Sequence, residues 1–139
     1  MTKTKNALLL ANARFYEAFE QFDIEALDSL WQRSENVRCI HPGSGVIEGW
    51  SEVRRSWESI FSGKVALRIS LRNVKAEIHN TAAIVTLVEE IVLRGGNNVR
   101  TASVAATNIF DFDNEEWKMI HHHGSVLTPA EDDLLYRYN

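Results

Sequence analysis

Three consecutive histidines, His121, His122 and His123, lie inside an apolar segment near the end of the 139-residue sequence. A purification tag would be longer, terminal and flanked by linker residues. Side chains alternate along a strand, so His121 and His123 share one face and His122 takes the other. Trp117 and Met119 share the parity of His121 and His123. We therefore expect His121 and His123 to point inward and His122 outward, unless a β-bulge reverses the parity.

Three hypotheses for the histidines remain open. In the first, His41 or an inward histidine is a general acid or base, because an imidazole titrates near neutral pH. In the second, His41, His121 and His123 form a three-histidine metal site with an open position. In the third, the histidines fill a semi-polar core and hydrogen-bond to the backbone or to each other. No carboxylate at a characteristic spacing reinforces the metal hypothesis, so we predict no metal and no other cofactor.

Other reactive side chains have simpler explanations. Glu89 and Glu90 are adjacent, so one of them faces inward or into an interface. Burial would raise its pKa and let it act as an acid, whereas an ion pair at an edge or in a dimer is the simpler explanation. Cys39 precedes His41 by two residues, but a Cys–His nucleophile also needs a third, orienting group. Arg100 could hold a substrate carboxylate, although we expect it to be solvated at a strand start.

Composition and charge exclude several classes of protein. The net charge of −4 comes without a marked basic patch, which argues against nucleic-acid binding. No apolar run approaches the roughly 20 residues of a membrane span. The short apolar run near the N-terminus is followed by charged residues, which argues against a secretory signal. The lone cysteine excludes an internal disulfide and a cysteine-based zinc site, so a cytoplasmic setting is the default expectation.

Periodicity predicts three helices before four long strands. Apolar spacing predicts helices over residues 5–21, over 23–32 with Asp23 as N-cap, and over 51–63 with Ser51 as N-cap. Short strands are expected at 36–41 and 44–49. Long strands are expected at 65–80, 81–94, 99–112 and 116–126. A change of phase near Asn73 predicts a bulge in the first long strand.

This order predicts one α+β domain spanning residues 1–139, with a core at about 6–126 and a C-terminal tail at 127–139. Four antiparallel strands wrapped over three N-terminal helices would form a cone with an apolar mouth, which is a natural ligand cavity. The run at 83–93 is apolar on both faces, which predicts a homodimer through the outer face of the sheet.

Several segments together carry a resemblance to a known family. They are, in chain order, "ARFYEAFEQFDIEALDSLW", "CIHPG", "GVIEGWSEVRRSW", "AATNIF" and "WKMIHHHGS". They resemble the SnoaL-like branch of the nuclear transport factor 2-like superfamily over roughly residues 6–126. The resemblance implies a cystatin-like cone. The superfamily includes ketosteroid isomerases, polyketide cyclases, scytalone dehydratase and the association domain of a calmodulin-dependent kinase, so the resemblance specifies the fold better than the reaction.

The resemblance also implies site residues. Ketosteroid isomerases use an Asp base with a Tyr and a protonated Asp as oxyanion donors. By resemblance, His41 occupies the position of the base and Asn108 that of the protonated Asp. The oxyanion Tyr falls on Phe15, with Tyr16 one residue off and pointing about 100° away. A supporting Tyr falls on Trp57, so steroid isomerisation by the same residues is not expected.

Two functional hypotheses follow. The first is a binding protein for a small, mostly apolar molecule with one carbonyl or hydroxyl, with isomerase, cyclase or dehydratase chemistry. Its candidate catalytic residues are His41, Asn108, His121 and His123, and its candidate pocket residues are Phe15, Tyr16, Trp50 and Trp57. The two tryptophans would also suit an ordinary core. The second hypothesis is a non-catalytic association module, whose pocket would be narrow and whose histidines would be hydrogen-bonded to fixed partners.

Overall fold

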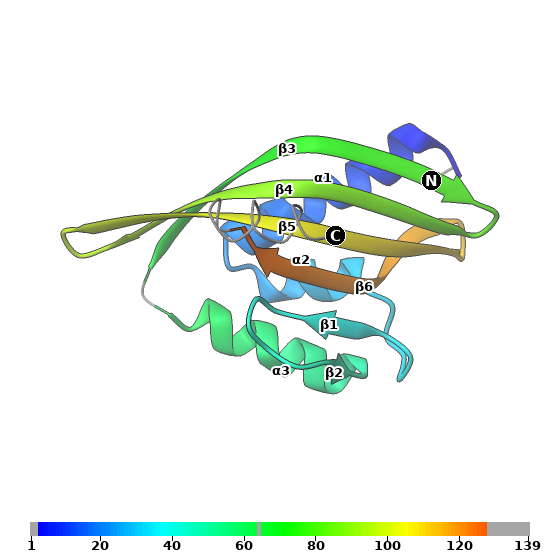
Figure 1. Ribbon diagram of the computed structural model, residues 1–139. Coiled ribbons are helices and arrows are strands. Elements are labelled where there is room, and N and C mark those ends of the chain that lie inside the picture. Colours follow the sequence, from blue (N-terminus) through cyan, green and yellow to red (C-terminus); the bar gives the residue numbers. More distant parts are fainter. Residues whose placement is uncertain (1–2, 64, 128–139) are drawn as a thin grey trace, which may run out of the picture.

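Three helices precede four long strands along the chain, in the predicted order. The computed structural model describes residues 3–63 and 65–127, so the tail predicted at 127–139 lies outside the described residues apart from Leu127. The helices are α1 (Lys5–Glu20), α2 (Ile24–Leu30) and α3 (Trp50–Phe61). The strands are β1 (Arg38–Ile40), β2 (Ile47–Glu48), β3 (Ala66–His79), β4 (Ala82–Gly95), β5 (Asn98–Asp113) and β6 (Glu116–Val126) (Figure 1).

The starts of α2 and α3 use different devices. Asp23 caps α2 as predicted, because its side chain accepts a hydrogen bond from the Ala26 amide at 3.1 Å. The prediction of Ser51 as the N-cap of α3 is wrong. Gly49 occupies that position with φ 83° and no side-chain cap. The tight turn out of β2 needs left-handed backbone, which glycine adopts without steric cost, and α3 therefore starts at Trp50.

All six strands form one sheet, in the order β2-β1-β6-β5-β4-β3. β1 runs parallel to β6, and every other neighbouring pair is antiparallel. The bulge predicted in β3 is confirmed: its register shifts between Arg72 and Lys75, where Asn73 has φ 57°. The long strands curve, and α1 passes behind them in Figure 1, so the helices cover the concave face of the sheet.

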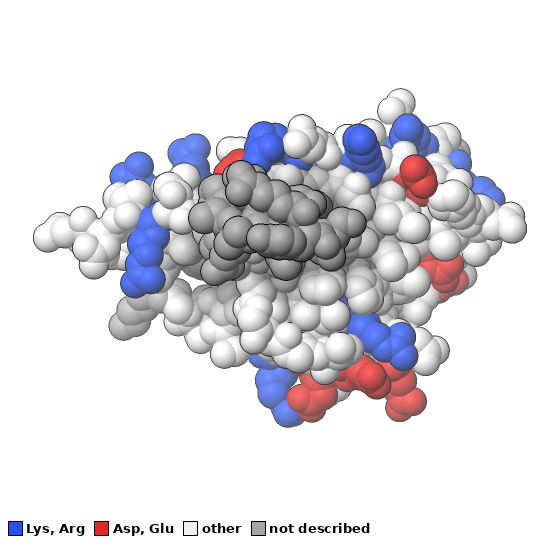
Figure 2. Space-filling model, viewed as in Figure 1, with Lys and Arg blue, Asp and Glu red and all other residues white. Residues whose placement is uncertain are grey.

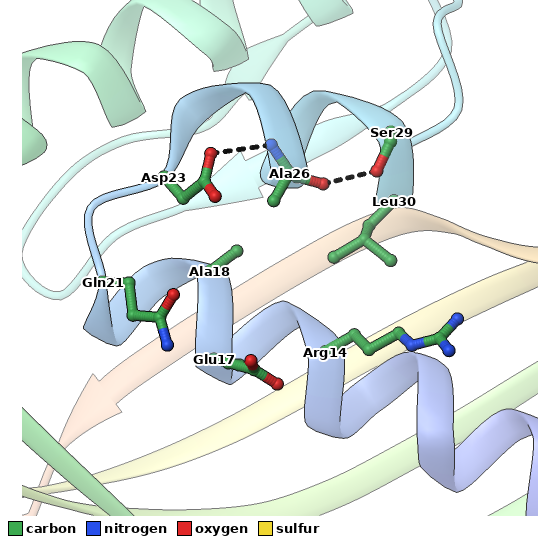
Figure 3. A pocket seen from close by; sticks show the side chains of 8 residues that line it. All are labelled: Arg14, Glu17, Ala18, Gln21, Asp23, Ala26, Ser29 and Leu30. Carbon is green, nitrogen blue, oxygen red and sulfur yellow. Dashed lines mark hydrogen bonds between the residues drawn. The ribbon is translucent and has the colours of Figure 1, made fainter.

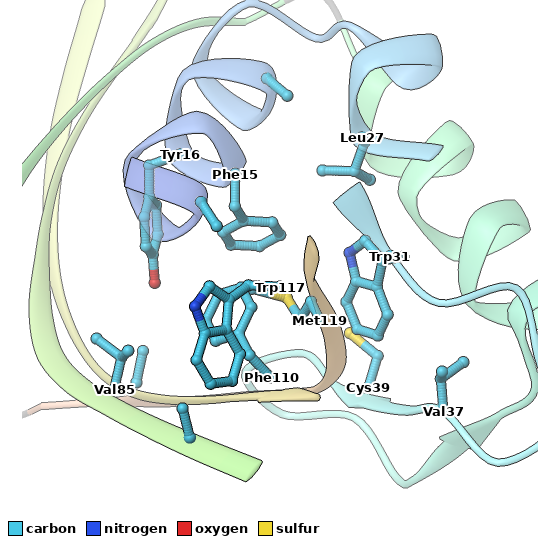
Figure 4. Close-up of a cluster of buried hydrophobic side chains, with 14 of the residues drawn as sticks. Phe15, Tyr16, Leu27, Trp31, Val37, Cys39, Val85, Phe110, Trp117 and Met119 are labelled. Carbon is cyan, nitrogen blue, oxygen red and sulfur yellow. The ribbon is translucent and has the colours of Figure 1, made fainter. Parts of the chain in front are cut away.

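The core lies between the helices and this concave face (Figure 4). Phe15 of α1 and Leu27 of α2 are fully buried opposite Phe110 of β5 and Trp117 of β6. Each large apolar side chain removed from water contributes about 1.5–3 kcal/mol to folding. These side chains fill the space between the helices and the sheet.

Charges of both signs lie on the face shown in Figure 2. Lys and Arg side chains gather over β3 and β4, and acidic side chains gather near α3 and β2.

Within residues 3–63 and 65–127, no helix is long and apolar enough to cross a bilayer.

A buried carboxylate holds α2 against α3. Asp28 of α2 is 8% exposed, and its Oδ1 accepts a hydrogen bond from Trp50 Nε1 at 2.6 Å. Its Oδ2 lies 2.9 Å from Arg33 and 3.2 Å from Arg54. Trp50, a predicted pocket residue, therefore belongs to the joint between two helices.

We expect Asp28→Ala to lower the free energy of unfolding by about 2–3 kcal/mol, because it leaves a buried indole N–H without its acceptor and removes the carboxylate that Arg33 and Arg54 bind. Urea denaturation measures this. The control is Glu52→Ala, which removes an exposed pair with Arg55 at 3.0 Å and should cost less than about 0.5 kcal/mol. Equal losses in the two variants would contradict the role given to Asp28.

Candidate functional site

The three histidines face opposite to the predicted orientation. His121 pairs with Ile109 but Met119 pairs with Phe110, so Ile120 is an extra residue in β6. This bulge reverses the parity between Met119 and the histidines. His122 is 2% exposed and points inward opposite Asn108, whereas His121 and His123 lie on the outer face of the sheet. The predicted orientation is wrong for this reason.

His122 belongs to a set of buried polar side chains that we call the inner polar cluster. The cluster consists of Asn12 and Tyr16 from α1, Glu89 from β4, Asn108 from β5 and His122 from β6. Each of the five residues is at most 4% exposed. Hydrogen bonds link all five, so three strands and a helix meet through polar groups in an otherwise apolar interior.

The hydrogen bonds indicate which atoms of the cluster carry protons and which accept them. Asn108 Nδ2 donates to Asn12 Oδ1 at 2.9 Å and to Tyr16 Oη at 3.1 Å. Its Oδ1 therefore faces His122 Nδ1 at 2.6 Å, and we infer that Nδ1 carries the proton. Tyr16 Oη in turn donates to Glu89 Oε2 at 2.6 Å. Among the described residues this leaves the His122 Nε2 lone pair without a hydrogen-bond donor, 4.0 Å from Glu89 Oε2.

Burial controls the protonation of the cluster. It raises the pKa of Glu89 from 4.5 to about 7, against the lowering effect of the Tyr16 hydrogen bond. Burial lowers the pKa of His122 from 6.5 to about 3, and His41, His121 and His123 lower it further. His122 Nε2 and Glu89 Oε2 are 4.0 Å apart, at the outer limit for an ion pair. Burial disfavours the charged form of each group, so an ion pair between Glu89 and His122 is not favoured.

Aromatic rings surround the cluster. Phe15 lies 4.8 Å from Tyr16, 5.1 Å from His122 and 5.6 Å from Trp57, measured between ring centroids. The predicted pocket residues Phe15, Tyr16 and Trp57 are thus brought together, whereas Trp50 is not. Tyr16 lies one residue beyond the position that the resemblance gives to the oxyanion Tyr, and it still reaches the cluster. The buried face of α1 is wide enough to include both positions, and Tyr16 supplies the hydroxyl.

His41 lies beside the inner polar cluster, and its ring already contacts Trp57 and Ser56. Its ring packs edge-on against Trp57 with centroids 4.8 Å apart, and its Nε2 is 2.8 Å from Ser56 Oγ. The Ser56 hydroxyl donates to the Val53 carbonyl at 2.6 Å, so His41 Nε2 carries a proton and donates to Ser56. Cys39 Sγ is 3.7 Å from that nitrogen, but burial and then Glu89 raise the pKa of the thiol. The thiolate that a Cys–His nucleophile needs is therefore disfavoured.

The three-histidine metal site predicted as one hypothesis does not form. His41 lies on the inner side against Trp57, whereas His121 and His123 lie on the outer face. In the part of the chain that the structure describes, no three His, Cys, Asp or Glu side chains are grouped to hold a metal ion.

The predicted cavity at His41 and Asn108 is absent from the five surface cavities that are described. One of them, of about 210 Å³, lies between α1 and α2 (Figure 3). Its rim carries Arg14 and Glu17, and its Asp23 and Ser29 side chains already bond to the Ala26 backbone. We interpret it as a solvated notch between two helices.

Sequence reasoning missed part of this site. Asn12 was not considered, although it lies four residues before Tyr16 on the buried stripe of α1. A polar residue on an apolar stripe was the available signal. Glu89 has the parity of the buried residues Val85 and Leu87, which could have placed it inward. Glu90 takes the outer face, where Arg72 and Ser103 bind its carboxylate.

Three helices on the concave face of a six-stranded sheet define an α+β cone of the nuclear transport factor 2-like, cystatin-like kind. Residues 9–129 match the model of the SnoaL-like domain, and the chain belongs to this family.

Proteins similar to this chain have varied descriptions. A crystal structure of a candidate dehydratase of the NTF2-like family from Streptomyces avermitilis is 34% identical, with a TM-score of 0.83 over 88% of this chain and 95% of that chain. A candidate association domain of calcium/calmodulin-dependent protein kinase type II from Thiobacillus denitrificans is 27% identical, with a TM-score of 0.70 over 85% and 93%. The F-box protein SKIP8 of Arabidopsis thaliana is 30% identical over 124 residues, which are 89% of this chain. The chain spans about half (51%) of the length of that relative.

Proposed function

We propose that this domain binds a small, mostly apolar molecule with a carbonyl or hydroxyl group inside the cone and performs acid–base chemistry on it. One observation carries the proposal: Glu89 is a buried carboxyl group without a Lys or Arg partner among the described residues. Burying such a group is unfavourable unless it is neutralised or paired. Perturbed, buried acids of this kind concentrate at functional sites.

In this proposal Glu89 transfers the proton. A pKa of about 7 leaves both of its forms populated at neutral pH, which suits a general acid or base. Tyr16 donates to its carboxylate, and the 4.0 Å gap to His122 Nε2 suits a substrate oxygen or a bridging water. Asn108 has both amide hydrogens engaged, so it is a positioning residue that holds His122 and Tyr16. His121 and His123 have no part in this chemistry.

The surroundings suit an uncharged, apolar substrate. Phe19, Trp57 and Phe61 pack against one another, with centroids 4.8 to 6.3 Å apart. Phe19 and Phe61 are half-buried, so in this proposal the substrate enters past these two rings. Apolar side chains around a few polar groups are the usual lining of a small-molecule site.

Dehydration is the reaction class that we favour, because the 34%-identical structure is described as a candidate dehydratase. For a β-hydroxy ketone, a base removes the proton on the carbon next to the carbonyl. A C=C bond forms, and the hydroxyl group leaves with a proton as water. Glu89 would protonate the leaving hydroxyl or accept the carbon-bound proton.

The test uses 4-hydroxy-4-phenylbutan-2-one, an uncharged β-hydroxy ketone whose dehydration gives a conjugated enone that absorbs in the near ultraviolet. We expect turnover by the wild-type domain and a loss of at least about 100-fold in kcat/KM in Glu89→Gln, the usual size of a general acid–base contribution. Glu90→Gln is the matched control, since it changes the adjacent carboxylate on the outer face. Equal activity in both variants would overturn the assignment of Glu89.

The second candidate function is an association module. Two observations favour it: no described cavity reaches the inner polar cluster, and the 27%-identical structure is described as an association domain. The outer face of β4 and β5 would then form the homodimer contact. In this case Glu89→Gln keeps the oligomer, and neither the probe nor related hydroxy ketones bind or turn over.

A further inference from the structure

The bulge at Ile120 leaves two histidines on the outer face, which we call the outer histidine pair: His121 and His123. They occupy positions i and i+2 of β6, so both side chains project from the same side of the strand. Their ring centroids are 6.4 Å apart. The sheet separates them from the inner polar cluster, so an inference about the pair does not rest on the acid–base function.

We propose that the outer histidine pair binds a Zn²⁺ ion together with the same pair from a second copy of the chain. Zinc binds imidazole nitrogen at about 2.0–2.1 Å and takes four ligands in a tetrahedral arrangement. Two donors on such an ion lie roughly 3.3 Å apart, by the same geometry. Rotation about the side-chain bonds of His121 and His123 brings their nitrogens to this separation.

One chain supplies only half of the ligands. Among the described residues, no third His, Cys, Asp or Glu joins the pair in a metal-binding arrangement. A two-fold contact presents the same surface twice, so a second copy supplies the two missing imidazoles. This requirement selects a second copy of the chain as the partner.

The surface beside the pair allows a second copy to approach. His123 lines a cavity of about 320 Å³ on the outer face, together with uncharged residues of β4, β5 and β6. On β4 and β5 and at the end of β6 the outward residues are uncharged: Thr86, Val88, Ala105, Thr107 and Ser125. On the other side of the pair, Arg38 of β1 lies beside His121 and pairs with Glu48 at 3.7 Å. Depletion of charge at the centre is typical of protein interfaces.

Sedimentation equilibrium at pH 7.5 tests the proposal, with ZnCl₂ or EDTA as the only difference between samples. We expect Zn²⁺ to lower the dimer dissociation constant of the wild-type chain at least tenfold. Titration calorimetry should give half a zinc ion per chain. Both effects should disappear in His121→Gln and in His123→Gln, which keep a polar side chain at each position.

The control is His79→Gln, which changes an exposed histidine of β3 that pairs with Glu77 and should respond like the wild type. Glu89→Gln should also keep the response, which separates this proposal from the acid–base function. An unchanged dimer dissociation constant would overturn the proposal, and so would binding of one zinc ion per chain without association. A zinc response that survives in the double variant His121→Gln/His123→Gln would also overturn it.

Discussion

Glu89→Gln is expected to make the protein more stable than the wild type at pH 8, by about 3 kcal/mol, and equally stable near pH 4. In the folded protein burial raises the pKa of Glu89 to about 7, against 4.5 ordinarily. Below pH 4.5 the carboxyl group is protonated in both states and affects stability little. Between pH 4.5 and 7 the unfolded chain releases this proton while the folded chain keeps it, so wild-type stability falls as pH rises.

The expected stability difference follows from the interval between the pKa of Glu89 in the unfolded and in the folded protein. At about 1.4 kcal/mol per pH unit, the interval from 4.5 to about 7 corresponds to about 3 kcal/mol. The glutamine side chain of the variant has no charge to bury, and its carbonyl can still accept the hydrogen bond that Tyr16 donates in the wild type. Urea denaturation of both proteins at several pH values measures the difference.

Three titratable groups face Glu89, and the comparison of wild type with Glu89→Gln controls for each of them. His122 has the opposite effect: burial lowers its pKa to about 3, so its contribution is present above pH 6.5 and is lost as pH falls toward 3. The pKa of Tyr16 and that of Cys39 are both raised, so these two groups stay neutral over the window. All three are present in both proteins and cancel in the difference. A constant difference from pH 4 to 8 would contradict the buried, proton-binding state of Glu89.

Asn108→Ala is expected to lower the free energy of unfolding by about 3–5 kcal/mol. Asn108 is fully buried and hydrogen-bonds Asn12, Tyr16 and His122. Truncation leaves three buried polar groups without this partner, and each such group costs about 1–3 kcal/mol. The urea midpoint should fall while its slope stays unchanged, since the surface exposed on unfolding is nearly the same.

Asn98→Ala is the control for this prediction. Asn98 is an exposed residue at the start of β5, where a truncation should change stability by less than about 0.5 kcal/mol. A loss below about 1 kcal/mol in Asn108→Ala would show that Asn108 does not hold the inner polar cluster together.

Local patterns in the sequence predicted the elements well, because they depend on neighbours in the chain. The apolar stripe of α1, the Asp23 cap and the bulge near Asn73 are confirmed. The N-cap of α3 lies two residues before the predicted Ser51, because Gly49 adopts a backbone that no pattern of side chains indicates. These features require only the periodicity and conformational preferences of short segments.

The sequence by itself determined the order of elements, the α+β cone and the family, since hydrophobic periodicity and several ordered segments specify them together. Only the tertiary structure decided which polar residues meet. One extra residue, Ile120, moves His122 inward and places His121 and His123 outside. Asn12 and Asn108 are 96 positions apart and join only when α1 lies across β5. Side-chain direction in a strand depends on pairing register, and register is set by partners distant in the chain.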